Sequence, residues 1–306
     1  MTQAAHFADR LTQAVLAKKS PLCVGIDPRW DSLPEALRKG TSLADQARAY
    51  STWSCALIDA IAPVVPVVKP QVAFFEALGH EGMRAYEEVV SHARAKGLLV
   101  IADVKRGDIS TTAEAYARAW LMEGAGTPWA EGRGPYAITA SPYLGGDSVE
   151  PLVLAASRAG KGVFVLVKTS NAGSGDLQDV MVDGRAMYMH VASRVVTWGR
   201  AHVGSEGYSL VGAVVGATHV VAATKLREAM PQAILLLPGL GAQGAKAADV
   251  KACFHEGMKG AIVSASRSVI FAYAQEPYRG HFGEKRWERA CEEAAKDLAA
   301  QVAAAL

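Results

Sequence analysis

Eight short apolar runs, spaced along the whole chain, constrain the fold more than any other feature of the sequence. They are continuous and rich in β-branched residues, and they occupy residues 22–26, 64–68, 98–102, 136–140, 163–167, 211–215, 234–237 and 261–264. Strands covered on both faces of a parallel sheet have this pattern, whereas half-exposed strands alternate apolar and polar residues. Helical periodicity fills the gaps, for example over residues 43–61, 74–95, 148–159 and 243–255. Eight strand–helix repeats predict an α/β fold, a closed (β/α)8 TIM barrel, with a doubly wound open sheet as the alternative.

We expect residues 1–306 to form a single barrel domain, because no linker interrupts the pattern. Three stretches are longer than a minimal barrel needs, at residues 28–40, 123–135 and 170–207. Loops of this length are usually lids or added packing elements, so we expect surface insertions there. The alanine-rich, amphipathic tail from residue 284 predicts a C-terminal helix.

Composition excludes several classes of function. The net charge of +2 gives no basic excess for nucleic-acid binding. No uncharged apolar run approaches the ~18 residues that a membrane span needs. Cys23, Cys55, Cys253 and Cys291 are scattered without a CxxC pair, so we expect reduced thiols and a cytoplasmic location. No histidine or carboxylate set has metal-ligand spacing, and we predict neither a metal site nor a cofactor.

The third apolar run ends in a cluster of charges: Asp103, Lys105, Arg106 and Asp108. A buried strand avoids charge, because moving an ion out of water costs several kcal/mol unless the ion is paired. Asp103 and Lys105 are two residues apart, so on a regular strand they project from the same face, with Val104 opposite. Taken alone, this pattern fits either the wall of a polar site or a charged turn.

Polar residues follow the other predicted strands at the same point. Active sites of such barrels lie at the rim formed by the C-terminal strand ends. The rim residues, in strand order, include Asp27, Lys69, Asp103 with Lys105, Ser141, Lys168, Thr218, Gly239 and Arg267. Charges scattered at random would not coincide with successive strand ends, and this coincidence favours a polar site at the rim.

The loop after the seventh run has the pattern GxGxxG, at Gly239, Gly241 and Gly244. A dinucleotide fingerprint would open the first βαβ unit and be followed about 20 residues later by an acid. Here the pattern comes late and the next strand ends at Arg267, which could accept a 2′-phosphate, so an NADP enzyme remains an alternative. The loops after strands seven and eight of a barrel often bind phosphate through backbone N–H groups. We therefore favour a phosphate site with Arg267 as a bidentate donor, over glycines that serve only tight turns.

Together these segments resemble the orotidine 5′-phosphate decarboxylase family, most closely its longer bacterial branch. GIDPRW, KPQVAFFE, DVKRGDISTTAEAY, SPYLGGD, PGLGAQG and SASRS stand in that family's order between residues 25 and 268. The resemblance implies a homodimeric TIM barrel that converts orotidine 5′-phosphate to UMP and CO2 in pyrimidine biosynthesis without a cofactor.

The resemblance also implies a role for each matching residue. Lys69, Asp103, Lys105 and Asp108 would form an array of alternating charge, in which Asp108 reaches the neighbouring subunit's site. The implied substrate contacts are Asp27 and Lys69 on the ribose hydroxyls, Thr112 across the dimer, Ser141 on the pyrimidine, Gln243 between ring and phosphate, and Arg267 with Gly241, Gln243 and Gly244 on the 5′-phosphate.

The chemistry of the reaction agrees with this array. Loss of CO2 from C6 of a pyrimidine leaves a carbanion without an aligned π system, so the protein must supply electrostatic stabilisation. Lys105, beside opposite charges, should stay protonated and can donate the proton that replaces CO2. Asp103 would repel the substrate carboxylate until CO2 leaves.

Two alternatives belong to other classes. A metal-dependent sugar-phosphate decarboxylase or aldolase on a related barrel has a similar DxKxxD, but it needs a Mg²⁺-binding carboxylate on strand two, where this chain has Lys69. A non-catalytic nucleotide-binding protein needs only the phosphate loop and leaves the charged rim residues without a role.

Overall fold

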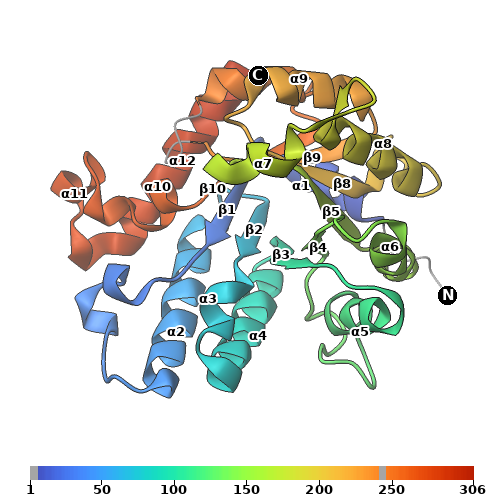
Figure 1. Ribbon diagram of the computed structural model, residues 1–306. Helices are drawn as coiled ribbons and strands as arrows, with labels where there is room; N and C mark the ends of the chain where they lie inside the picture. The colour runs from blue at the N-terminus through green and yellow to red at the C-terminus, as the bar shows by residue number, and fades with distance from the viewer. Residues whose placement is uncertain (1–5, 241–245) are drawn as a thin grey trace.

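Eight parallel strands close into a barrel in the computed structural model, which describes residues 6–240 and 246–306 (Figure 1). The strands are β1 (Leu22–Ile26), β2 (Val67–Pro70), β3 (Leu99–Arg106), β4 (Ala137–Ala140), β5 (Gly162–Lys168), β8 (Ser209–Val215), β9 (Ala233–Pro238) and β10 (Ala261–Ala265). They pair in chain order, and β10 pairs back onto β1. The predicted barrel is confirmed, and the open sheet is excluded.

Burial on both faces explains why the strands have continuous apolar sequences. Every residue of β1, β4, β8 and β10 is buried. At the N-terminal end of the barrel, α1 (Phe7–Lys18) closes the interior, where the Phe7 ring packs edge-on against Phe164 with ring centroids 5.9 Å apart. A Cβ at Gly162 would lie 2.2 Å from the Phe7 ring, so this close packing requires glycine.

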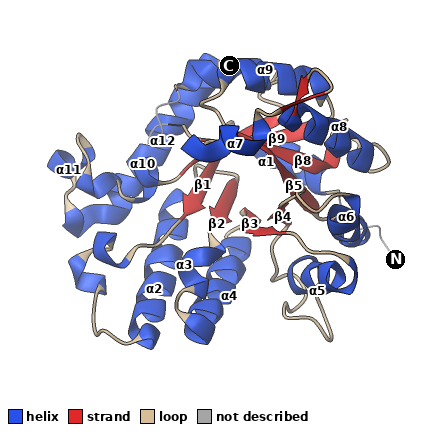
Figure 2. Cartoon of the chain, in the orientation of Figure 1, coloured by secondary structure: helices blue, strands red, loops and turns tan. Residues whose placement is uncertain are grey.

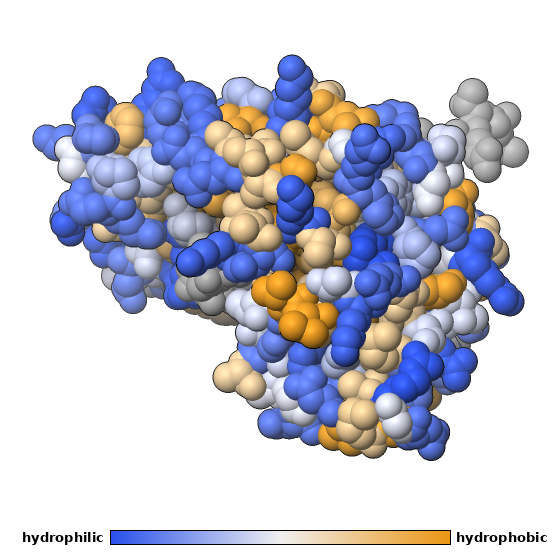
Figure 3. Space-filling model, turned by 90° about the horizontal axis from the view of Figure 1, so that it is seen from above, coloured by the Kyte–Doolittle hydropathy of each residue, from blue (hydrophilic) through white to orange (hydrophobic). Residues whose placement is uncertain are grey.

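Helices surround the barrel (Figure 2). The longer ones are α2 (Leu43–Ile61), α4 (Gly79–Ala95), α5 (Ser110–Leu121), α6 (Gly146–Ala159), α8 (Met187–Gly199), α9 (Val220–Ala229) and α12 (Trp287–Ala305). The shorter ones are α3 (Val72–Glu76), α7 (Gly175–Gln178), α10 (Arg267–Ile270) and α11 (Tyr278–His281). Their apolar faces pack inward, and on the face seen in Figure 3 hydrophilic side chains predominate around a more hydrophobic middle. None of these helices is long and apolar enough to cross a membrane.

Two predicted helices differ from the structure. The helix predicted over residues 74–95 is two helices, α3 and α4, because the chain turns before Gly79, which has φ +63°. A Cβ at Gly82 would lie 1.9 Å from the carbonyl oxygen of Phe75, so the two helices approach where only glycine fits. The helix predicted over 243–255 is a 3₁₀ segment, Ala247–Cys253, and residues 243–245 lie outside the described part of the chain.

The three long stretches contain distinct elements. Residues 28–40 hold the 3₁₀ turns Trp30–Ser32 and Glu35–Leu37. Residues 123–135 are held by Glu123, whose carboxylate accepts a hydrogen bond from Arg94 at 2.6 Å and lies 2.9 Å from Nζ of Lys161. The stretch 170–207 contains α7, the hairpin β6 (Met181–Val182) with β7 (Arg185–Ala186), and α8, which packs on β5 and β8 as a regular barrel helix.

Lys168, at the C-terminal end of β5, fastens the segment before α8 to the barrel. Its side chain is 2% exposed, and its Nζ lies 2.7 Å from Oδ1 of Asp179 and over the ring of Tyr188. The next residue is also held, because the N–H of Thr169 donates to Oε1 of Gln178 at 2.9 Å. Asp179 itself is 53% exposed, so water reaches one partner of the ion pair and not the other.

This asymmetry predicts unequal effects of removing each partner. Asp179→Ala leaves a buried, unpaired ammonium, and we expect it to lower the free energy of unfolding by about 3 kcal/mol. Lys168→Met leaves only a hydrated carboxylate, and we expect a loss of about 1 kcal/mol or less. Urea denaturation of both variants measures the difference, and equal losses would contradict the burial of Lys168.

Candidate active site

Asp103, at the C-terminal end of β3, is the centre of the charged cluster. Its Oδ2 lies 2.5 Å from Nζ of Lys69, and its Oδ1 lies 2.5 Å from Nζ of Lys105. Gln71 Nε2 donates to Oδ2 at 3.1 Å, and the hydroxyl of Thr139 donates to Oδ1 at 2.9 Å. The side chains of Asp103 and Lys69 are 8% and 12% exposed, whereas that of Lys105 is 46% exposed. Lys105 is therefore the cation of the cluster that solvent, or a ligand, reaches most readily.

The charges of the cluster hold one another in the ionised form. Burial alone would raise the pKa of Asp103, but the ammonium groups of Lys69 and Lys105 outweigh it and hold that pKa well below its usual range. Burial alone would lower the pKa of Lys69, but the carboxylates of Asp103 and Asp27 outweigh it and raise that pKa above its usual range. Both groups are thus charged at neutral pH.

Lys105 lies in an irregular part of β3. Ala102 is opposite Ile138 and Arg106 is opposite Ala140, so four steps along β3 match two along β4. Lys105 has φ +45°, in the left-handed region that residues other than glycine seldom adopt. Asp103 and Lys105 meet as predicted, but the predicted reason, alternation along a regular strand, is wrong, because this β-bulge interrupts the strand.

The ends of β1 and β10 bring two more predicted residues to the rim. Asp27 follows β1, and its Oδ2 accepts from the hydroxyl of Ser266 at 2.6 Å. A Cβ at Gly25 would lie 3.0 Å from Cβ of Ser266, so the two strand ends approach closely. Arg267 begins α10 with an exposed side chain, and within residues 6–240 and 246–306 no carboxylate pairs with it. Its guanidinium is thus available to an anion.

Ser141 follows β4 beside the bulge. Its N–H donates to the carbonyl of Arg106 at 2.9 Å, and a Cβ at Gly107 would lie 2.9 Å from its carbonyl oxygen. The backbones of residues 107 and 141 thus touch at the rim. Three other predicted phosphate-binding residues, Gly241, Gln243 and Gly244, lie outside the described residues.

Asp108 and Thr112 do not join the cluster within one chain. Asp108 accepts from the N–H of Ile109 at 2.8 Å, and in the part of the chain that the structure describes no ion pair links it to Lys105 or Lys69. Thr112 is exposed near the start of α5. Among the described residues, a single chain therefore presents Lys105 with one carboxylate partner, Asp103.

Sequence reasoning assigned no role in the site to Gln71 or Thr139. Gln71 directly follows β2, and its position after Lys69 at a strand end was a usable signal. Thr139 lies inside β4 and is 1% exposed. A threonine within a β-branched strand gives no signal of its own, because threonine is common in strands.

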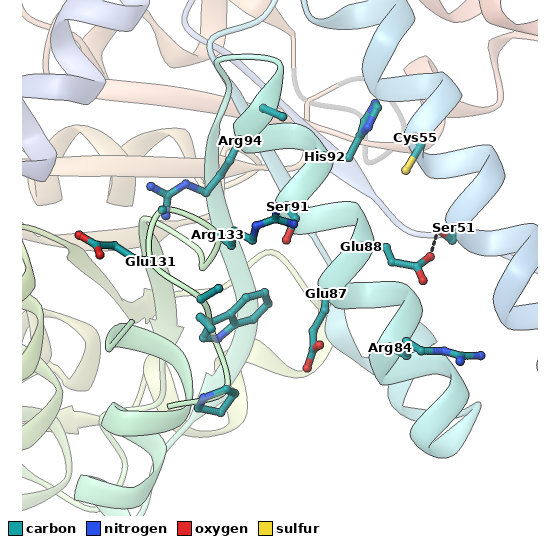
Figure 4. A pocket seen from close by; sticks show the side chains of 15 residues that line it. Ser51, Cys55, Arg84, Glu87, Glu88, Ser91, His92, Arg94, Glu131 and Arg133 are labelled. Atoms are coloured by element: carbon teal, nitrogen blue, oxygen red, sulfur yellow. Dashed lines mark hydrogen bonds between the residues drawn. The ribbon is translucent and has the colours of Figure 1, made fainter. Parts of the chain in front are cut away.

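A groove on the outer wall of the barrel is separate from this site. It measures about 780 Å³, lies between α4 and residues 128–133, and shares no lining residue with the charged cluster (Figure 4). Glu88 at its wall accepts from the hydroxyl of Ser51 at 2.7 Å. Its labelled charged side chains carry both signs and do not converge on one point, so they form no evident ligand site.

The lowered pKa of Asp103 predicts how stability depends on pH. A carboxyl group whose pKa is lower in the folded than in the unfolded chain stabilises the fold above the unfolded value of about 3.9. That contribution disappears as the pH falls from there towards the folded value. The difference in the free energy of unfolding between wild type and Asp103→Asn should therefore shrink between about pH 4 and pH 2. Urea denaturation over this range tests it, and a constant difference would contradict the lowered pKa.

Comparisons with known proteins agree with the fold and with the motifs. The model of the "Orotidine 5'-phosphate decarboxylase / HUMPS family" matches residues 20–277. Proteins named orotidine 5′-phosphate decarboxylase are similar over nearly their full length. That of Rhodopirellula baltica is 47% identical over 289 residues, 93% of this chain and 94% of the relative. That of Deinococcus radiodurans is 43% identical over 267 residues, covering 87% and 89%.

Solved structures give the same result. A putative orotidine 5′-phosphate decarboxylase from Streptomyces avermitilis has a TM-score of 0.79 and 34% identity, over 99% of this chain and 97% of that one. The OMP decarboxylase of Leishmania donovani has a TM-score of 0.74 and 33% identity, over 98% of each chain. The chain therefore belongs to the orotidine 5′-phosphate decarboxylase / HUMPS family.

Proposed function

We propose that this chain is a carboxy-lyase that converts orotidine 5′-phosphate to UMP and CO2, a step of pyrimidine biosynthesis, without a cofactor. The observation that carries the proposal is Asp103, buried between Lys69 and Lys105 at the barrel rim. Relatives that cover most of the chain have that activity in their names, which supports the same substrate here.

Lys105 is the proton donor in this proposal. The bond from C6 to the carboxylate breaks, its electron pair stays on C6, and a proton moves from Nζ of Lys105 to C6 while CO2 leaves. An ammonium fixed beside the forming carbanion stabilises the transition state more than the substrate, which is what accelerates the step. Asp103 orients Lys105 and faces the substrate carboxylate, so their repulsion ends when CO2 departs. Lys69 keeps Asp103 ionised.

The other predicted residues bind the parts of the substrate that do not react. Asp27 and Lys69 would hold the ribose hydroxyls and Ser141 the pyrimidine, while Arg267 binds the 5′-phosphate with Gly241, Gln243 and Gly244. The exposed guanidinium of Arg267 at the start of α10 supports the phosphate role. Binding energy from a phosphate far from the broken bond can orient the ring over Lys105.

We also propose that the protein is a homodimer in which Asp108 and Thr112 reach the partner's site. Two observations support this: Asp108 makes no ion pair with the lysines of its own cluster in the described ranges, and Thr112 is exposed. A closed two-fold dimer places such residues in both sites at once. The free, scattered cysteines fit a reducing compartment, and we propose the cytoplasm.

The metal-dependent sugar-phosphate enzyme has less support. The position on β2 that would hold a metal-binding carboxylate is Lys69. Among the described residues, no group of three or more His, Cys, Asp or Glu side chains could hold a metal ion.

Lys105→Ala should abolish turnover while the fold is kept. A general acid together with a transition-state cation contributes at least about 10³-fold, so we expect kcat to fall by that factor or more. Ultraviolet absorbance of orotidine 5′-phosphate follows the reaction, and circular dichroism checks the fold. Near-normal activity of the variant would exclude Lys105 as the donor.

The same assay with EDTA separates the cofactor-independent decarboxylase from the metal-dependent sugar-phosphate enzyme. A decarboxylase that uses no metal ion should keep full activity when EDTA is present. Loss of activity with EDTA, recovered with Mg²⁺, would favour the metal enzyme instead.

Mixed dimers test whether Asp108 serves the partner's site. Lys105→Ala and Asp108→Asn should each be inactive alone. If Asp108 crosses the interface, a mixed dimer has one site with both changes and one with neither, so the isolated mixed dimers should have about half of wild-type activity. Co-expression with two affinity tags isolates the mixed dimers. If Asp108 serves its own subunit, these dimers will be as inactive as the parents.

A further inference from the structure

A single hydroxyl group contacts three consecutive residues of the bulge. Oγ1 of Thr139 accepts from the N–H of Val104 at 3.0 Å and from the N–H of Lys105 at 2.9 Å, and it donates to Oδ1 of Asp103 at 2.9 Å. A threonine hydroxyl has one donor and two acceptor sites, so these bonds use its full capacity. We propose that Thr139 is a positioning residue that sets the geometry of Asp103 and Lys105, an inference that rests on the proposed function.

The bulge explains why a side chain is needed there. In a regular parallel sheet, the N–H groups of Val104 and Lys105 would donate to carbonyl groups on the strands beside β3. Here the pairing of β3 with β4 is irregular between Ala102 and Arg106, the segment that contains both residues. Val104 is 4% exposed, and a buried N–H without a partner costs about as much as a lost hydrogen bond. Thr139 supplies the missing acceptor, and its hydrogen bonds stabilise the left-handed backbone conformation of Lys105.

Arg106 also holds the backbone of the bulge. Its Nη1 donates to the carbonyl of Val104 at 3.1 Å, and its guanidinium pairs with Glu76 of α3. The same group lies 5.5 Å and 5.7 Å from the ring centroids of Tyr116 and Trp120 on α5. Two side chains, those of Thr139 and Arg106, therefore hold the backbone of the bulge, and of these two Thr139 also contacts the carboxylate of Asp103.

The hydrogen bond from Thr139 fixes which oxygen of Asp103 serves which lysine. Oδ1 receives Thr139 and Lys105, and Oδ2 receives Gln71 and Lys69. Without the hydroxyl, the carboxylate can rotate and the backbone of Lys105 can relax, so Nζ loses its position relative to C6. The ribose and phosphate contacts lie on other strands, and the effect should appear in kcat rather than in KM.

The experiment compares Thr139→Val with Thr139→Ser. Valine keeps the branched shape and removes the hydroxyl, and we expect kcat to fall roughly 10- to 100-fold, with KM within about threefold of wild type. Serine keeps the hydroxyl and should retain most of kcat. Thr12→Val is the matched control, because Thr12 is 4% exposed in α1 at the opposite end of the barrel, and its kcat should stay at the wild-type value.

Several outcomes would overturn the inference. Wild-type kcat in Thr139→Val, or a loss in Thr139→Ser as large as in Thr139→Val, would exclude positioning by the hydroxyl. If the valine variant fails to fold, kcat of Thr139→Ser is compared with kcat of Thr139→Ala, because these two smaller side chains also differ by the hydroxyl group. A wild type without activity would refute the proposed function instead. In that case crystal structures of the two variants test the positioning role, because Lys105 should lose its positive φ in Thr139→Val and keep it in Thr139→Ser.

Discussion

The ion cluster around Asp103 is the interaction on which the site depends. Three charged groups lie together, two of them largely out of water, and the cost of dehydrating each ion is several kcal/mol. Short contacts to Lys69 and Lys105, with further hydrogen bonds from Gln71 and Thr139, offset this cost. These partners come from three adjacent strands, β2, β3 and β4, so the cluster depends on the register in which these strands pair.

A regular barrel would not hold Lys105 in its observed position. The ladder between β3 and β4 is interrupted at the residues that carry charge, and Lys105 has a left-handed backbone. Local strain of this kind persists only where surrounding contacts determine the conformation. The hydroxyl of Thr139 and the guanidinium of Arg106 supply those contacts at the residues where the ladder between β3 and β4 is interrupted.

The sequence predicts the elements that depend on local pattern and burial. It does not predict features that depend on contacts between residues far apart in the chain. Residues 43–61 form α2 as predicted, because the helical period is clear and Ser42 caps it with Asp45. The break between α3 and α4 depends on the positive φ of Gly79 and on the close approach of Gly82 to Phe75, which periodicity does not reveal. The rim charges were predictable because each lies at or close to the C-terminal end of an apolar run. The role of Thr139 was not predictable, because it depends on the contact of its hydroxyl with the bulge of β3, a segment more than 30 residues away in the chain.

The closed strand order also explains how distant segments form one site. In the barrel β1 lies between β2 and β10, so Asp27 stands between Lys69 and Ser266. Its carboxylate raises the pKa of Lys69 on one side and accepts from Ser266 on the other. A continuous polar line therefore runs from Asp103 through Asp27 to the start of α10. A nucleotide with its phosphate at Arg267 and its ring at Lys105 would lie along this line with its ribose over β1. The line crosses four neighbouring strands, β3, β2, β1 and β10, and a closed sheet holds the spacing between them constant.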